Sequence, residues 1–544
     1  MGAIVSCFLG RWGSRVRRYT ALITMVTVAY LLCLLAIPVR VSAQVRAEQP
    51  NIIVVLTDDQ GYADIGAYAV NGDVRTPHID QLAREGVLMT SGYVTAPQCV
   101  PSRAGLITGR YQQSFGVDGN DTGPLPLNQQ TVADHLQRAG YVTGAVGKWH
   151  LSPTHEQHEW IAANVPLPWT FNEFGQVLIP ASYLAPYHPR NRGFTEYFLG
   201  SRHRFDANFD LDGTSLPIGS IVLDDRTKVE VQSDAAIAFV DRNHRNPFFL
   251  YLAYSAPHVP FESPDSYLDI FPDIDSVRRR YALATLAQID VGVGRIVSKL
   301  KDYAIDRKTL IVFLSDNGAP YRIDKKDLPI SDTSGGWNGS LNDPWIGEKG
   351  MLTEGGIRIP FLMWYPDRIP QGTQYDHPVI SLDIAATAYA LAGLSIPDVD
   401  GHDLLPVVEA AAPEPAHEFL FWRWDGQLAI RSGQTKYLAL EDGTDFLFDL
   451  GSPSHEALNL VKSDPKLADT LWRKAWGWAQ GLSRPDFPTR LNVFRRSYLD
   501  YYLGDVLAEE SRAAAITQIT DTVRTANGAI ATKRSETEGE HYDQ

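Results

Sequence analysis

The stretch Asn51-Ile-Ile-Val-Val-Leu-Thr-Asp-Asp59 decides the fold class of this chain. Its continuous apolar run is typical of a parallel strand that is covered on both faces. The run stops at two adjacent carboxylates, Asp58 and Asp59. Ligands of open α/β sheets bind beyond the carboxyl ends of the strands, so this stretch predicts an α/β fold and the edge where its functional groups lie.

Three later apolar segments show the same pattern. Each ends in charged or imidazole residues: 141–147 before Lys148 and His150, 247–255 before His258, and 309–315 before Asp316 and Asn317. A fifth strand is expected over 359–365, and helices over 77–86, 131–140 and 279–300. Because the carboxyl ends of parallel strands meet at one edge of a sheet, we expect these polar side chains to converge there.

A second motif, Cys99-Val-Pro-Ser-Arg-Ala-Gly-Leu-Ile-Thr-Gly-Arg110, follows the first predicted strand. Pro101 and Ser102 are residues that begin helices, so Cys99 is expected just ahead of a helix N-terminus, where free N–H groups favour negative charge. Arg103, about one turn further on, adds a cation near the same point. From the residues alone, Cys99 is either a nucleophile of lowered pKa or a buried structural cysteine.

Composition limits the classes of function. The chain has 544 residues and a formal net charge of -15. Residues 1–43 hold five arginines and no other charged residue, so the remainder is more acidic still. This balance argues against nucleic acid as a partner, because nucleic-acid binding needs a basic face. An anionic substrate would need a locally positive pocket.

The N-terminal segment predicts export. Arginines precede an apolar run over about 19–38, and Val41-Ser42-Ala43 has the small residues of a cleavage site, so we expect a signal peptide cut after Ala43. An uncleaved anchor helix is the alternative, because the apolar run nearly reaches spanning length. Cys7 and Cys33 lie in this segment, so the mature chain keeps one cysteine and has no internal disulfide.

The C-terminal part predicts a second, smaller sheet. Residues 410–415 have the composition of a linker, and short strands are expected over 418–424, 427–431, 436–440 and 445–450, followed by a helix over 465–482. We therefore expect four parts: a signal peptide (1–43), a catalytic α/β domain (44–408), a small C-terminal α+β domain (409–483) and an extension (484–544) whose end is disordered.

The Cys99 motif resembles the signature of the formylglycine-dependent (type I) sulfatases, relatives of alkaline phosphatase. In that family the cysteine is oxidised after translation to 3-oxoalanine (formylglycine). The resemblance runs from about Asn51 to Asp367. It implies a large mixed, mostly parallel sheet flanked by helices, with a smaller C-terminal antiparallel sheet domain. It also implies a sulfuric ester hydrolase, and a formylglycine-generating enzyme as maturation partner.

The resemblance implies a metal site as well. Carboxylate and amide oxygens are hard ligands that suit Ca²⁺ or Mg²⁺. By resemblance, the cation is Ca²⁺, with Mg²⁺ as the alternative, and an oxygen of modified Cys99 completes a ligand set formed by Asp58, Asp59, Asp316 and Asn317.

The remaining roles are also implied by the resemblance. Hydrated formylglycine at Cys99 would attack sulfur, positioned by Arg103 and Asp316. Lys148 and Lys349 would bind the sulfate oxygens. His258 would protonate the leaving alcohol, and His150 would remove the remaining hydroxyl proton so that sulfate leaves.

The substrate is expected to be a sulfated polysaccharide or oligosaccharide, met outside the cell or in the periplasm with no membrane contact after cleavage. Long segments at 153–245 and 319–347 are rich in aromatic and cationic residues, and the tentative sugar contacts are His203, Arg204, Trp337 and Trp345. Residues 336–345 are similar to carrageenan-acting members, while ulvan, fucan or glycosaminoglycan would fit as well. The alternatives are an arylsulfatase, a phosphodiesterase or phosphonate hydrolase, and a non-catalytic sulfated-glycan binding protein.

Overall fold

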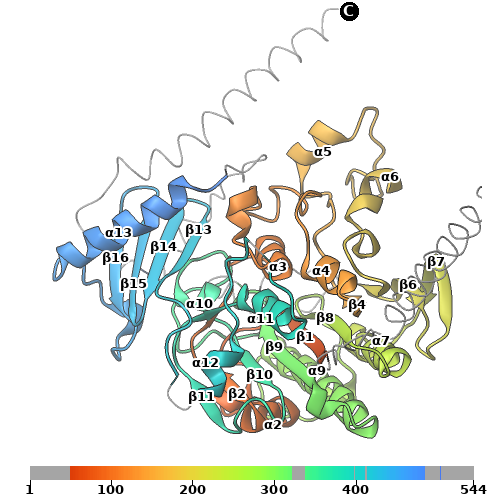
Figure 1. Cartoon of the computed structure of the whole chain (residues 1–544). Helices are drawn as coiled ribbons and strands as arrows, with labels where there is room; N and C mark the ends of the chain where they lie inside the picture. Colours follow the sequence, from red (N-terminus) through yellow and green to blue (C-terminus); the bar gives the residue numbers. More distant parts are fainter. Residues whose placement is uncertain (1–48, 321–336, 397, 411–412, 484–502, 504–544) are drawn as a thin grey trace, which may run out of the picture. The chain divides into compact units, whose positions relative to one another are not determined.

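The computed structural model describes residues 49–320, 337–396, 398–410, 413–483 and 503 (Figure 1). The expected signal peptide and nearly all of the C-terminal extension lie outside these residues. Contacts between Cα atoms divide the chain into the units Met1–Gln49 and Pro50–Gln544, and the elements below all belong to the second unit.

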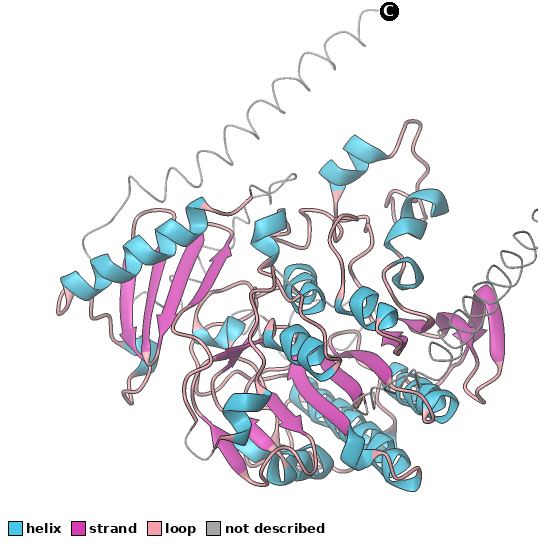
Figure 2. Cartoon of the chain, viewed as in Figure 1, coloured by secondary structure: helices cyan, strands magenta, loops and turns pink. Residues whose placement is uncertain are grey.

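The main feature is a ten-stranded sheet in the order β11-β2-β10-β9-β1-β8-β4-β5-β6-β7 (Figures 1 and 2). Its five central strands run parallel: β9 (Thr309–Ser315), β1 (Asn51–Asp58), β8 (Phe248–Pro257), β4 (Val142–Gly147) and β5 (Glu196–Ser201). Antiparallel pairs join the outer strands β10 (Phe361–Trp364), β2 (Val87–Met89), β6 (Arg204–Phe209) and β7 (Ser215–Leu223) to the sheet, and the edge strand β11 (Thr373–Tyr375) runs parallel to β2. The expected large mixed, mostly parallel sheet is confirmed.

The central strands are buried on both faces, as their unbroken apolar runs predict. Every residue of β1 is buried. Ile52 and Val54 face one hydrophobic core, and Ile53 and Val55 face the other, because successive side chains of a strand point to opposite faces. The first core contains side chains from α3 (Cys99–Thr108), α4 (Val132–Arg138) and α11 (Asp383–Leu391); the second contains side chains from α2 (Pro77–Glu85), α7 (Lys228–Asn243) and α9 (Val277–Asp302).

Shorter elements connect these layers. The remaining helices and strands are α5 (His158–Asn164), α6 (Ala181–Leu184), α8 (Asp265–Leu268), α10 (Glu354–Ile357), α12 (Leu405–Glu409), β3 (Gly92–Tyr93) and β12 (Val379–Ile380). Turns of 3-10 helix occur at Gly66–Tyr68, Gln112–Phe115, Ala185–Tyr187, Pro189–Asn191, Asp306–Lys308 and His455–Ala457.

The region 153–245 holds more regular structure than the sequence predicts. It contains three strands of the main sheet, β5 to β7, and the sixteen-residue helix α7. Strand β7 is mostly exposed, so it lacks the apolar run that marks the central strands. No helix or strand is predicted from the sequence for this long segment, so these elements are missed.

A separate four-stranded sheet follows, as expected. Its strands β13 (Leu420–Trp424), β14 (Gln427–Ser432), β15 (Thr435–Leu440) and β16 (Asp445–Asp449) form an antiparallel meander. Helix α13 (Pro465–Gln480) lies along this sheet in Figure 2 and shares a core with its outer face through Ile430, Tyr437 and Leu471. The inner face, including Trp422 and Leu438, belongs to the first core of the main sheet.

A buried ion cluster joins the small sheet to helix α10. The Nζ atom of Lys436 in β15 lies 2.9 Å from Oε1 of Glu354 and 2.9 Å from Oε1 of Glu456. The backbone N–H of Glu354 donates to the other carboxylate oxygen of Glu456 at 2.8 Å. Burial raises the pKa of Glu456 to about 7, against the lowering effect of Lys436. Glu354 also has two arginine partners, because its Oε2 lies 3.1 Å from Nη1 of Arg358 and 3.6 Å from Nη1 of Arg431. Among the described residues, Lys436 is the ion-pair partner of Glu456.

We expect Lys436→Met to lower the free energy of unfolding by about 3–5 kcal/mol, because it removes the ion-pair partner of the buried Glu456, whereas Glu354 keeps Arg358. Urea unfolding at pH 8 measures the loss. The pKa of Glu456 is about 7 in the folded protein and about 4.3 in the unfolded chain. Protonation of Glu456 therefore stabilises the folded state below about pH 4, and this contribution is lost as the pH rises to about 7. Removal of Lys436 raises the folded pKa further, so the variant should lose less stability at pH 6 than at pH 8.

The matched control is Lys466→Met, which changes an exposed lysine of α13 and is expected to alter stability by less than about 0.5 kcal/mol. If Lys436→Met is no more destabilising than this control, the cluster does not hold the small sheet against α10.

Candidate active site

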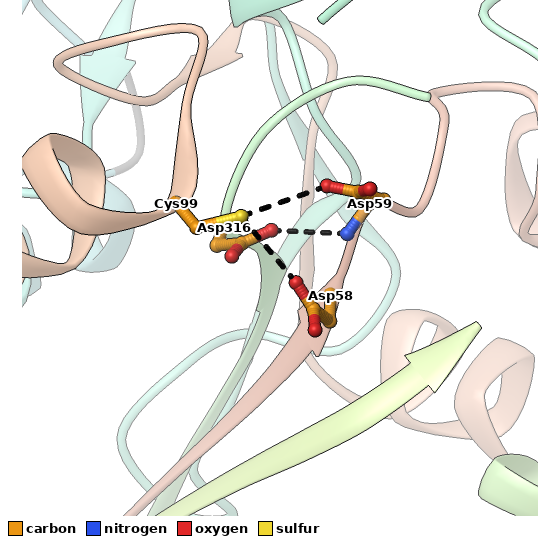
Figure 3. Close-up of side chains that lie close together, drawn as sticks. All are labelled: Asp58, Asp59, Cys99 and Asp316. Atoms are coloured by element: carbon orange, nitrogen blue, oxygen red, sulfur yellow. Dashed lines mark hydrogen bonds between the residues drawn. The ribbon is translucent and has the colours of Figure 1, made fainter. Parts of the chain in front are cut away.

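The carboxyl ends of four parallel strands bring the predicted residues together. Asp58 and Asp59 end β1, Lys148 and His150 follow β4, His258 follows β8, and Asp316 and Asn317 follow β9. Cys99 approaches the same point from α3. One ligand atom each of Asp58, Asp59, Cys99 and Asp316 lies within 4.8 Å of the others, and all four residues are buried (Figure 3).

Cys99 is the first residue of α3, one position further into the helix than the sequence predicts. The preceding Gln98 is extended and makes no capping hydrogen bond through its side chain, so the helix lacks the polar cap that usually marks a start. The Sγ atom lies 3.6 Å from Oδ1 of Asp58, 3.8 Å from Oδ1 of Asp59 and 3.3 Å from Nζ of Lys349. Burial and the Asp316 carboxylate raise the pKa of the Cys99 thiol, so a thiolate nucleophile is not favoured.

Three cations compensate the buried carboxylates one by one. Lys148 Nζ lies 2.7 and 2.9 Å from the two oxygens of Asp58, and Lys349 Nζ lies 2.6 and 2.9 Å from those of Asp59. The fully buried Arg103 donates to Oδ2 of Asp316 through two nitrogens, at 2.7 and 2.9 Å.

These pairs set the charge of the site. Burial alone would raise the pKa of Asp58, but Lys148 and the neighbouring cations outweigh it and hold that pKa well below its usual range. The pKa of Asp59 is lowered in the same way, burial again being outweighed, here mainly by Lys349. Asp58 and Asp59 are therefore ionised beside ammonium groups, whereas burial raises the pKa of Asp316 despite the neighbouring Arg103.

The donor set fits a divalent cation. The side-chain nitrogen of Asn317 donates to Oδ1 of Asp59 at 2.7 Å and to the carbonyl oxygen of Gly318 at 2.9 Å. Its side-chain oxygen is buried and has no hydrogen-bond partner among the described residues. A buried oxygen without a donor, beside three carboxylates, is what a hard cation such as Ca²⁺ or Mg²⁺ requires.

Lys349 reaches the site because two backbones approach closely. Gly318 follows Asn317, and a Cβ atom there would lie 1.9 Å from the carbonyl oxygen of Gly355 in α10. The backbone N–H of Lys349 donates to the carbonyl oxygen of Ala319 at 3.1 Å. Only glycine at position 318 allows the segment that carries Lys349 to lie against the end of β9.

The two histidines differ in environment. His150 is held at a φ of 57°, and its Nδ1 atom is buried without a partner among the described residues. Burial and the nearby Lys148 lower the pKa of His150 well below its usual value, so the imidazole is neutral and can accept a proton. His258 is about one third exposed, its Nδ1 lies 2.6 Å from the carbonyl oxygen of Val259, and its Nε2 lies 3.6 Å from Oδ2 of Asp59.

A pocket of about 340 Å³ opens beside these groups. It is lined by Asp58, Lys148, His150 and His258, and also by Arg202, Lys228 and Ser255, which the sequence did not single out. Arg202 lies at the turn between β5 and β6, and Lys228 begins α7. Both lie in the segment 153–245, for which the sequence predicts no helix or strand. An alternating pattern over 204–209 was the available signal for the hairpin.

The tentative sugar contacts lie in different surroundings. His203 and Arg204 are exposed and adjoin the pocket residue Arg202, with Nδ1 of His203 3.4 Å from Oδ1 of Asp225. Trp337 donates its indole N–H to the carbonyl oxygen of Ser340.

Trp345 stacks beneath Arg358, whose guanidinium carbon lies 3.8 Å from a ring centroid, and packs against Tyr62 and His455. Neither tryptophan lines the pocket. Residues 321–336 of the same segment lie outside the described part of the chain.

Comparisons with known proteins agree with this geometry. A family model described as Sulfatase matches residues 50–394. The N-acetylgalactosamine-6-sulfatase of Canis lupus familiaris is 33% identical over 414 residues, 72% of this chain and 71% of that protein. Arylsulfatase D of Homo sapiens is 27% identical over 443 residues, 69% of this chain and 71% of that protein.

A solved structure also matches along most of its length. The crystal structure of Ps i-CgsB in complex with k-i-k-neocarrahexaose superposes with a TM-score of 0.65 and 29% sequence identity, and the match covers 84% of this chain and 97% of that one. The family match, the relatives and the convergence of Cys99 with three carboxylates show that the chain belongs to the sulfatase family, the type I sulfuric ester hydrolases of the alkaline phosphatase superfamily.

Proposed function

We propose that this sulfatase removes sulfate from a sulfated polysaccharide or oligosaccharide, with a formylglycine derived from Cys99 as nucleophile. The observation that carries this proposal is the meeting of Cys99, three carboxylates, three cations and two histidines beside one pocket, which Asp58, Lys148 and both histidines line. A pure binding protein has no use for a neutral, half-buried His150 beside the anion site.

Among sulfated glycans we place carrageenan-type galactans first. The support is the likeness to a solved structure that holds a neocarrahexaose, at 29% identity. Ulvan and fucan remain alternatives, and glycosaminoglycans do as well, because curated relatives are named N-acetylgalactosamine-6-sulfatases. An arylsulfatase, or a phosphodiesterase or phosphonate hydrolase, is the alternative within the superfamily.

The cations of the chain would bind the sulfate group. Lys148 and Lys349 each place an ammonium group against one carboxylate at the floor of the site. The fixed guanidinium of Arg103 holds Asp316 in place and donates to the carbonyl oxygen of Lys148 at 3.1 Å. These three cations only balance the three carboxylates, so a divalent cation held beside them would be needed to make the site locally positive for an anionic substrate. The ammonium groups would then stabilise charge that develops on the sulfate oxygens.

The histidines would move protons at two points. The Nδ1–H of His258 donates to a backbone carbonyl, so Nε2 is the atom that protonates the oxygen of the departing alcohol as its bond to sulfur breaks. His150, neutral because of its burial, would accept a hydroxyl proton when sulfate is released.

The proposed reaction also needs a nucleophile and a Lewis acid, which a formylglycine at position 99 and a divalent cation would supply. Hydrated formylglycine at position 99 carries two hydroxyls on one carbon, one to attack sulfur and one whose deprotonation lets sulfate depart, and a formylglycine-generating enzyme would be needed to make it. A divalent cation, Ca²⁺ in this proposal and Mg²⁺ as the alternative, would be held by Asp58, Asp59, Asp316 and Asn317 and would supply Lewis acidity.

We also propose that the protein is exported to the periplasm or secreted, with the signal peptide cut after Ala43. Helices that are long and apolar enough to cross a membrane do not occur among the described residues. The signal segment itself lies outside them.

The first test is Cys99→Ala, compared with wild-type protein produced together with a formylglycine-generating enzyme. Sulfate release is measured by ion chromatography on carrageenan, ulvan and glycosaminoglycan oligosaccharides and on 4-nitrophenyl sulfate. We expect wild-type protein to release sulfate from one polysaccharide, and Cys99→Ala to lower the rate by more than about 1,000-fold, because the nucleophile is lost.

Other outcomes would redirect the proposal. Release from the aryl sulfate alone would favour an arylsulfatase. Release that survives Cys99→Ala would contradict the mechanism. If mass spectrometry shows converted Cys99 and no substrate is cleaved, the glycan-binding or phosphonate-hydrolase alternatives gain ground, and a phosphonate monoester is then the discriminating substrate.

A second prediction concerns the metal. Dialysis against EDTA is expected to abolish sulfate release and to lower the thermal unfolding temperature, because a bound cation at 100 times its dissociation constant stabilises the fold by about 2.7 kcal/mol. Added Ca²⁺ should restore both properties at a lower concentration than Mg²⁺. Asn317→Ala is the matched variant, and its unfolding temperature should respond much less to EDTA. Full activity after complete removal of metal would disprove the site.

A further inference from the structure

Lys228 is a buried lysine that the proposed mechanism does not use. Its residue is only 3% exposed, yet it is the first residue of α7 and lines the active-site pocket. A cation in the first turn of a helix is unfavourable, because the free N–H groups there are already positive. Burial lowers the pKa of Lys228 to about 8, which shows the cost of placing the ammonium group at this point. Residues that break local rules in this way often serve a site.

The contacts of Lys228 explain its position. Its Nζ atom donates to the carbonyl oxygen of His258 at 2.9 Å and to that of Pro260 at 3.0 Å. Its backbone N–H donates to Oε2 of Glu262 at 3.0 Å. One side chain therefore binds the carbonyl groups of the two residues that flank Val259, and its own backbone is anchored by the segment that follows.

This segment determines how the imidazole of His258 points. The ring is held by Nδ1, which lies 2.6 Å from the carbonyl oxygen of Val259, between the two carbonyls that Lys228 binds. The other ring nitrogen, Nε2, faces the site and lies 3.6 Å from Oδ2 of Asp59. The ring is about one third exposed, so the clamped backbone supplies orientation that packing alone does not.

We propose that Lys228 is a positioning residue for His258: its ammonium group holds the backbone on both sides of Val259 and thereby aims the imidazole at the oxygen of the leaving alcohol. This inference rests on the proposed function, in which His258 is the proton donor. Two of the three N–H donors of Lys228 are used by these carbonyls, so its role is assigned to the position of His258 and not to the chemical step.

The test is the response of Lys228→Met to the leaving group. Substrates are aryl sulfates of graded leaving ability, from 4-nitrophenyl sulfate to 4-methoxyphenyl sulfate, so the result does not depend on which polysaccharide is natural. Good leaving groups need little protonation, whereas poor ones depend on the general acid, which contributes about 100- to 10,000-fold. We expect kcat to fall less than about 3-fold for the nitrophenyl ester and about 10- to 100-fold for the methoxyphenyl ester, with KM nearly unchanged.

The ratio of the two rates is independent of how much of the variant is folded, so partial unfolding cannot imitate the effect. Lys466→Met, which changes an exposed lysine in the first turn of α13, is the control and should leave the ratio unchanged. Lys228→Gln, which keeps an N–H donor without the charge, is expected to give an intermediate ratio.

A double-mutant cycle connects the effect to His258. In a His258→Ala background, Lys228→Met should not increase further the dependence of kcat on the leaving group, because the side chain that Lys228 positions is absent. The proposal is overturned if kcat falls equally on all esters, or if KM alone changes. It is also overturned if the double-mutant cycle is additive, or if both Lys228 variants fail to fold. If wild-type protein hydrolyses no sulfate ester, the proposed function itself fails, an outcome distinct from these.

Discussion

Three carboxylates that point into one buried space repel one another, and the rest of this structure is arranged to offset that repulsion. Asp58, Asp59 and Asp316 each receive a cation at 2.6 to 2.7 Å. The cations come from three separate segments: α3, the end of β4, and the segment before α10. The site therefore exists only when the whole sheet has formed, because no local stretch of chain contains both a carboxylate and its counterion.

Much of this arrangement could be predicted from the order of residues. Strand β9 has the predicted bounds, and β1 is one residue longer than its apolar run, because charged residues end the runs of buried parallel strands abruptly. The start of α3 was predicted one residue too late because Gln98 caps it without a side-chain hydrogen bond. The catalytic assignments still depend on the family resemblance, since geometry alone shows proximity and charge.

What the sequence could not predict depends on contacts between distant segments. Strand β10 is buried on both faces and only four residues long, so nothing in its composition shows that it runs antiparallel to β9. Trp345 lies in a segment whose composition is typical of a sugar-binding loop, but the guanidinium of Arg358, from another segment, covers its ring. Lys228 carried no signal at all, because its partners are backbone carbonyls thirty and thirty-two positions away.

The inner face of the small sheet contributes Trp422 and Leu438 to the core that also contains Ile52 of β1. Its Lys436 compensates Glu354, five positions beyond the active-site residue Lys349. Recombination could therefore not exchange the small sheet between relatives without a change in the contacts of the α/β part. The two parts should be inherited together, whereas the outward side of α13 is free to diversify.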